Sequence, residues 1–151
     1  MTLPPFTALP PELLAAALVT LGAPVWPAAE VAVAAVEAGR EADVDARWLA
    51  AVAWAESGGT LAAEPRGAVT LGVCQVHPAW SPLSRETLLT RRGSVFGAAW
   101  LYARIVAKHG RKDAHLLYGC GIDRCGGRWS PAARWKVRQW RRVRREVVHV
   151  Q

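Results

Sequence analysis

The segment AVAWAESGGT, residues 51–60, decides how the rest of this sequence is interpreted, because a carboxylate ends an apolar stretch there. Glu56 is followed at once by Ser57 and two glycines, a pattern that indicates the end of a helix. Asp45 precedes the stretch and is a preferred residue for capping its start. Glu56 therefore lies, at helical spacing, on the same face as the apolar residues Trp48, Leu49, Val52 and Ala53.

The flanking sequence predicts a mostly α chain with no internal repeat and no long linker. Helices are expected over about residues 12–21, 28–38 (closed at Gly39), 46–57 and 94–108, and from residue 131 onward. A helical turn or two is expected before Gly119. Residues 58–72 are rich in Gly, Pro and small side chains, which favours a loop or a short irregular hairpin.

Positive charge is concentrated at the C-terminal end. The chain has a net charge of +7, no Lys or Arg before Arg40, and nine such residues in 124–145. Such an excess implies an anionic partner: nucleic acid, acidic lipid headgroups or anionic polymers of a bacterial envelope. The alternative is a helix that docks by its Val and Trp and keeps a solvated cationic face. We expect docking combined with envelope binding, without a specific nucleic acid, through Arg134, Lys136, Arg138, Arg141, Arg142, Arg144 and Arg145.

Four segments, in order, resemble the lysozyme-like lytic transglycosylases of the soluble type: AWAESGG, LGVCQVHPAW, SVFGAAWLYARI and LLYGCG. In that family a helix ends in Glu-Ser, a Gly-x-x-Gln segment follows, and a further helix precedes a Tyr-Asn-x-Gly-like turn. The resemblance covers roughly residues 28–121. The chain departs from the pattern at Ser94, where the family has Asn, at Gly119, and at Cys74, where an apolar residue is usual.

The resemblance implies one lysozyme-like domain with a catalytic cleft between helical lobes. Residues 1–27 would form a helical extension, 28–123 the core, and 124–151 a basic amphipathic helix packed on the same domain. It further implies a monomer that cleaves the β-1,4 bond between N-acetylmuramic acid and N-acetylglucosamine in peptidoglycan, without a cofactor.

The chemistry explains why one carboxylate suffices. Cleaving a glycosidic bond requires an acid that is still protonated near neutral pH, and loss of hydration on an apolar helix face would keep Glu56 protonated. By resemblance, Glu56 then takes the proton of the C6 hydroxyl of muramic acid, which closes a 1,6-anhydro ring. The alternative is an acid that faces solvent or pairs with Arg66.

The resemblance also assigns substrate contacts. Ser57 would bond the acid or an acetamido group, and Gln75 would bind sugar in the cleft. Tyr118 would place its hydroxyl near Glu56, and Trp80 would stack on a sugar face. The alternative roles are structural: Ser57 would be an ordinary helix-end residue, Gln75 a polar loop residue and Tyr118 a core residue.

A second acid would change the reaction. Goose-type lysozymes, relatives with the same core, use aspartates that follow the catalytic Glu to activate water. Between Glu56 and Gln75 this chain offers only Glu64. A hydrolytic muramidase is therefore the alternative enzyme, and a solvated loop acid is the alternative role of Glu64.

The three cysteines are Cys74, Cys120 and Cys125. Together with His77 they could supply four zinc ligands, but paired Cys-x-x-Cys spacing is absent. We expect no metal and reduced, buried thiols, with a disulfide between two of the three as the alternative.

No transmembrane helix is expected, because Gly22, Pro24, Pro27 and Glu30 interrupt the apolar run 13–38. The N-terminus lacks the basic start of a signal peptide. Together with the resemblance, this predicts a phage lytic protein that acts on the bacterial cell wall. It would stay cytoplasmic until release or be carried in the virion; a wall enzyme of a secretion apparatus is the other setting.

Overall fold

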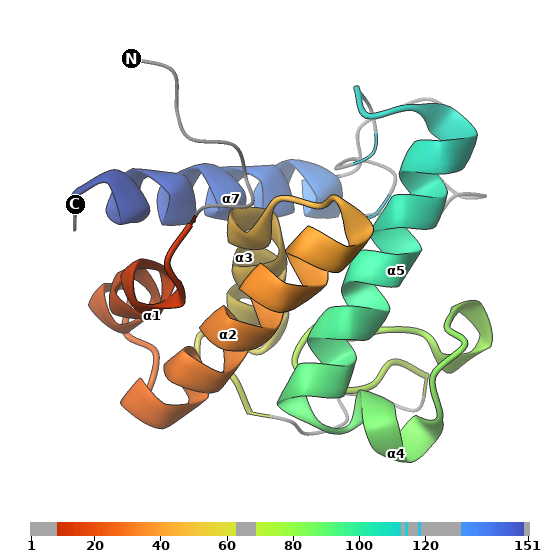
Figure 1. The fold of residues 1–151 in the computed structure, drawn as a ribbon, viewed down its shortest axis with the longest axis horizontal. Helices are drawn as coiled ribbons and strands as arrows, with labels where there is room; N and C mark the ends of the chain where they lie inside the picture. Colours follow the sequence, from red (N-terminus) through yellow and green to blue (C-terminus); the bar gives the residue numbers. More distant parts are fainter. Residues whose placement is uncertain (1–8, 63–68, 113, 115–117, 119–130, 150–151) are drawn as a thin grey trace.

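The computed structural model describes residues 9–62, 69–112, 114, 118 and 131–149. Within these residues the only β pairing is an isolated antiparallel bridge between Leu71 and Val76. The predicted mostly α class is therefore confirmed (Figure 1). The elements are α1 (Pro11–Thr20), α2 (Val25–Ala42), α3 (Ala46–Glu56), the 3-10 helix η2 (Pro78–Trp80), α4 (Arg85–Leu88), α5 (Arg91–His109) and α7 (Pro131–His149).

Helix α3 is the centre of the fold and packs against α1, α2, α5 and α7. The carboxylate of Asp45 accepts the backbone N–H of Arg47 at 2.9 Å and so caps the helix, as the sequence predicted. Trp48 is fully buried, and its ring centroid lies 6.0 Å from that of Trp140 on α7. The ring of Tyr102 on α5 lies 5.9 Å away. Trp48 is thus the residue at which α3, α5 and α7 meet.

Helix α2 is longer than predicted and continues through Gly39, which the sequence suggested as its end. The chain leaves the helix instead at Asp43, in the left-handed conformation with φ 54°. It then folds back so closely that a Cβ on Gly39 would lie 2.5 Å from the carbonyl oxygen of Val44. Gly39 is therefore required for a close backbone approach and does not stop the helix.

The N-terminal helix is part of the same core. Leu14, Ala17 and Leu18 of α1 are buried, and the helix packs against α2, α3 and α7. Helix α2 begins at Val25 and crosses the boundary expected at residue 27. The helix expected from residue 28 thus begins three residues earlier, at Val25.

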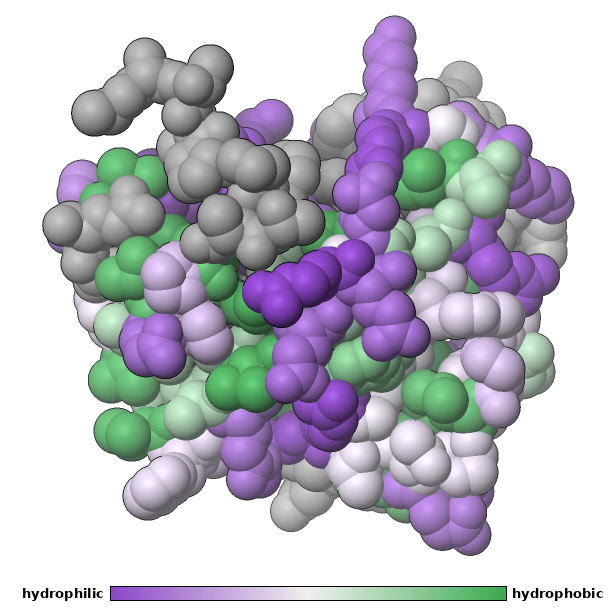
Figure 2. All heavy atoms as spheres, in the orientation of Figure 1, coloured by the Kyte–Doolittle hydropathy of each residue, from purple (hydrophilic) through white to green (hydrophobic). Residues whose placement is uncertain are grey.

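Helix α7 lies across α3 and α1 and, as expected, docks on the same body (Figure 1). Val137, Val143 and Val147 are buried on its inner face. An ion pair joins α5 to α2, because Arg91 bonds Glu30 at 3.0 Å. Figure 2 shows that hydrophilic side chains gather on the surface over α2. Among the described helices, none combines the length and the hydropathy that a transmembrane span requires.

Candidate functional site

Glu56 is the last residue of α3, and its carboxylate forms an ion pair with the ammonium group of Lys136 on α7. The Glu56 side chain is 20% exposed and that of Lys136 is 14% exposed. Glu56 was expected to have apolar surroundings, and the structure differs in one respect, because the ammonium group of Lys136 lies against its carboxylate. Lys136 was expected on a solvated basic face, but its side chain points toward α3.

A short hairpin follows α3 in the chain and carries Cys74 and Gln75. Leu71 and Val76 exchange two backbone hydrogen bonds of 3.0 Å. The fully buried Ser94 of α5 accepts the N–H of Cys74 at 3.0 Å. Gly72 has φ +75°, and a Cβ there would lie 2.1 Å from the carbonyl oxygen of Leu88. Ser94 thus holds the hairpin against α5.

The side chain of Gln75 is used inside this hairpin. Its Nε2 donates to the carbonyl of Gly72 at 2.9 Å, and its Oε1 accepts the hydroxyl of Thr70 at 2.6 Å. Gln75 itself has a left-handed φ of 51°. These bonds close the turn, and no hydrogen bond to Glu56 is present in the described residues. Gln75 therefore shapes the hairpin in this structure.

Cys74 and Tyr118 lie close enough to Glu56 for its charge to affect them. Burial raises the pKa of the Cys74 thiol from 9.0 to about 12, with Glu56 as a smaller raising cause. Burial also raises the pKa of Tyr118 well above 10.0, and again Glu56 contributes. The ammonium group of Lys136 lies 5.7 Å from the centroid of the Tyr118 ring. Glu56, Tyr118, Lys136 and Cys74 thus form one cluster, which we call the Glu56 cluster.

In the described part of the chain, Ser57 and Trp80 make contacts with residues close to them in the sequence. The Ser57 hydroxyl accepts the N–H of Leu61 at 2.9 Å and donates to the carbonyl of Trp54 at 3.3 Å, which closes the helix end. Trp80 is 48% exposed, and its ring stacks on His77 with centroids 4.8 Å apart. Glu64, Cys120 and Cys125 lie outside the described residues.

Cys74 is a free, buried thiol. Within the described part of the chain, no group of three or more His, Cys, Asp or Glu side chains is placed to hold a metal ion.

Two pockets that described residues line lie away from Glu56, which lines neither of them. One, of about 410 Å³, lies on α7 beside the start of α3. The other, of about 320 Å³, lies between α2 and α5 and includes Leu83, Phe96 and Trp100. A cleft in front of Glu56 remains an expectation from the sequence.

The sequence contained one unused signal for the ion pair. Lys136, Trp140, Val143 and Val147 recur at helical spacing, so Lys136 lies in line with the apolar stripe of α7. A lysine on a docking face needs a partner acid. Which acid meets it depends on how α7 crosses α3, and spacing along one helix carries no information about that crossing.

The buried thiol and phenols predict a loss of stability at alkaline pH. Burial raises the pKa of Tyr102 from 10.0 to about 12, as it does that of Cys74 from 9.0. The folded state keeps these protons while the unfolded chain loses them, so stability is full below about pH 9 and falls as the pH rises toward 12. Each such group contributes a slope of about 1.4 kcal/mol per pH unit.

Urea unfolding at about pH 8 and pH 11 tests this sign. The midpoint is expected to be lower at the higher pH, and a Cys74→Ala variant should show a smaller drop. An unchanged midpoint would show that these groups are not shielded from water.

No protein-family model, no curated protein and no solved structure matches the chain. A function is therefore inferred from the residues of the Glu56 cluster and from the sequence resemblance.

Proposed function

We propose that this chain cleaves the β-1,4 bond between N-acetylmuramic acid and N-acetylglucosamine in peptidoglycan, leaves 1,6-anhydro ends, and acts at the bacterial cell wall. The supporting observation is that Lys136 pairs with Glu56 and also lies 5.7 Å from the centroid of the Tyr118 ring, while the charge of Glu56 acts on both Tyr118 and Cys74. Glu56, Cys74 and Tyr118 come from three of the four segments that resemble lytic transglycosylases. The fourth, α5, holds the hairpin through Ser94.

In the proposed reaction Glu56 is the sole general acid and base. As a neutral acid it donates its proton to the leaving oxygen while the bond from C1 to that oxygen breaks. The resulting carboxylate accepts the proton of the C6 hydroxyl, whose oxygen bonds to C1. No water enters and no second carboxylate is required. In the proposed site the hydroxyl of Tyr118 donates a hydrogen bond to the sugar beside Glu56, and burial, which raises its pKa further above 10.0, keeps it protonated.

The ion pair with Lys136 defines which state of the site the structure represents. A salt bridge needs the carboxylate, whereas the first proton transfer needs the neutral acid. In the proposed reaction this pairing suits only the second step, in which Glu56 accepts a proton. For the first step the lysine has to move away, which its flexible four-carbon chain allows.

The same ion pair favours a second candidate function, a cationic binding module without enzymatic activity. On this alternative Glu56 anchors α7 on α3 by neutralising Lys136. The hydrolytic muramidase is a third candidate and depends on a second acid such as Glu64.

Digestion of purified peptidoglycan, followed by mass spectrometry of the fragments, separates the candidates. Anhydro ends are lighter than reducing ends by one water molecule, so the transglycosylase is expected to give the lighter products. Reducing ends would identify a muramidase. An absence of cleavage by the folded protein would overturn both enzymatic candidates and leave the binding module.

A further inference from the structure

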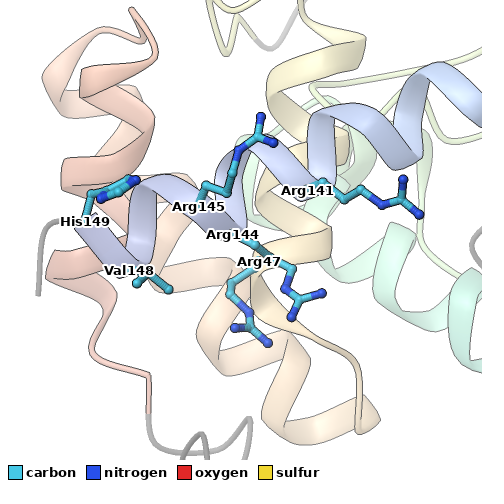
Figure 3. A pocket seen from close by; sticks show the side chains of 6 residues that line it. All are labelled: Arg47, Arg141, Arg144, Arg145, Val148 and His149. Carbon is cyan, nitrogen blue, oxygen red and sulfur yellow. The ribbon is translucent and has the colours of Figure 1, made fainter.

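A groove of about 410 Å³ between α7 and the start of α3 gathers positive charge. It is lined by Arg47 of α3 and by Arg141, Arg144, Arg145, Val148 and His149 of α7 (Figure 3). We call these four arginines the arginine groove. The α7 members fall at i, i+3 and i+4, which places them on one face of the helix. No carboxylate lines the groove.

Two of the arginines are held in place by neighbouring groups. Arg47 is bound to the carboxylate of Asp45 through Nε at 2.9 Å and Nη2 at 3.2 Å. The guanidinium of Arg144 lies 4.9 Å from the centroid of the Trp140 ring, a contact that fixes it without cancelling its charge. Figure 3 shows Arg47 beside Arg144. These two form a preorganised base for the groove, and preorganisation reduces the cost of binding.

The other two arginines lie on the exposed surface along α7. Arg141 and Arg145 are both exposed, and within the described chain neither they nor Arg144 form an ion pair with a carboxylate. Like charges four residues apart destabilise a helix. Arg47 is paired with Asp45, whereas no carboxylate lines the groove itself, so its four guanidinium groups leave an excess of positive charge there that an anion would relieve.

The groove is compact. From Arg141 to His149 the helix rises about 12 Å, a little over two turns. Two other basic residues of α7 have partners of their own: Lys136 pairs with Glu56, and Arg142 lies over the Trp54 ring at 5.4 Å. Arg134 and Arg138 are exposed and continue the face of Arg141 and Arg145, but they do not line the groove. The lining of the groove itself is confined to these two turns and Arg47, so its size suits a small ligand.

We propose that the arginine groove binds a compact ligand with two closely spaced phosphate groups. Guanidinium forks match phosphate oxygens in bidentate geometry, and the volume of the groove is that of a small-molecule site. Arg47 and Arg144 bind one phosphate, and Arg141 and Arg145 close on the second. A free diphosphate and the bisphosphorylated headgroup of a glycolipid both present this chemistry. The site is independent of Glu56 and of the proposed cleavage reaction.

The test compares two double variants of equal charge on the same helix. Arg141→Gln with Arg145→Gln removes two charges from the groove. Arg138→Gln with Arg142→Gln removes two exposed charges at the same spacing outside it. Calorimetric titration of the full chain with pyrophosphate measures affinity. We expect the groove variant to lose about tenfold or more, because hydrogen bonds to charged groups are lost, and the control variant to lose much less.

Vesicles of zwitterionic lipid, with and without a bisphosphorylated glycolipid, distinguish the two sources. If the protein binds the glycolipid vesicles and the groove variant does not, the ligand is a lipid headgroup. If the protein binds pyrophosphate but not these vesicles, the ligand is a soluble diphosphate. Equal losses in both variants, or no saturable pyrophosphate binding, would overturn the proposal. So would a single-stranded oligonucleotide that binds more tightly than pyrophosphate and is weakened equally by both variants.

Discussion

Replacing Glu56 with glutamine is expected to reduce the rate of peptidoglycan cleavage by about 10²–10⁴-fold or more, because the substituted amide can neither donate nor accept the proton. The measurement is the release of anhydro-muropeptides from purified peptidoglycan, at matched concentrations of folded protein. Cleavage by Glu56→Gln at the original rate would show that the acid only anchors α7, and the glycosidase proposal would fail.

This substitution also leaves the charge of Lys136 without its partner, so stability has to be separated from chemistry. The Lys136 side chain is only 14% exposed, and an uncompensated buried charge destabilises a protein. Lys136→Met keeps a long unbranched chain without the charge. We expect the double variant Glu56→Gln with Lys136→Met to regain stability over Glu56→Gln alone while remaining inactive. Recovery of cleavage in the double variant would mean that the lost activity reflected misfolding.

Replacing Trp48 with alanine is expected to lower the free energy of unfolding by about 3–5 kcal/mol, a large part of the roughly 5–15 kcal/mol typical of a domain. Trp48 is fully buried, and its ring contacts those of Tyr102, Tyr118 and Trp140. Removal of the Trp48 ring would therefore leave a cavity that reduces the packing of α3, α5 and α7 together.

Urea unfolding of Trp48→Ala and Trp54→Ala measures this effect. Trp54 lies on the same helix but is only partly buried, with Arg142 over its ring. We expect a distinctly smaller loss for Trp54→Ala. Equal losses would show that Trp48 is not the junction of the three helices.

Local sequence predicted the helices well, because caps and apolar periodicity act within a few residues. Asp45 caps α3 as expected, and α7 begins at Pro131. The prediction was wrong at Gly39, since a glycine that ends a helix and one that admits a neighbouring backbone look the same in the sequence. Similarly, α5 begins three residues earlier than expected because Thr90 caps it by accepting the N–H of Gly93.

For the candidate site, the sequence located Glu56 at the end of α3 and on its inner face, because the period of a helix fixes which side chains share a face. It likewise indicated a basic α7 that docks by valine and tryptophan. Only the tertiary structure decided that Lys136 meets Glu56 and that Arg47 joins the arginines of α7. Both contacts join residues about 80 or more positions apart, and they depend on the angle at which α7 crosses α3. That angle results from the packing of all the helices together, which no local pattern encodes.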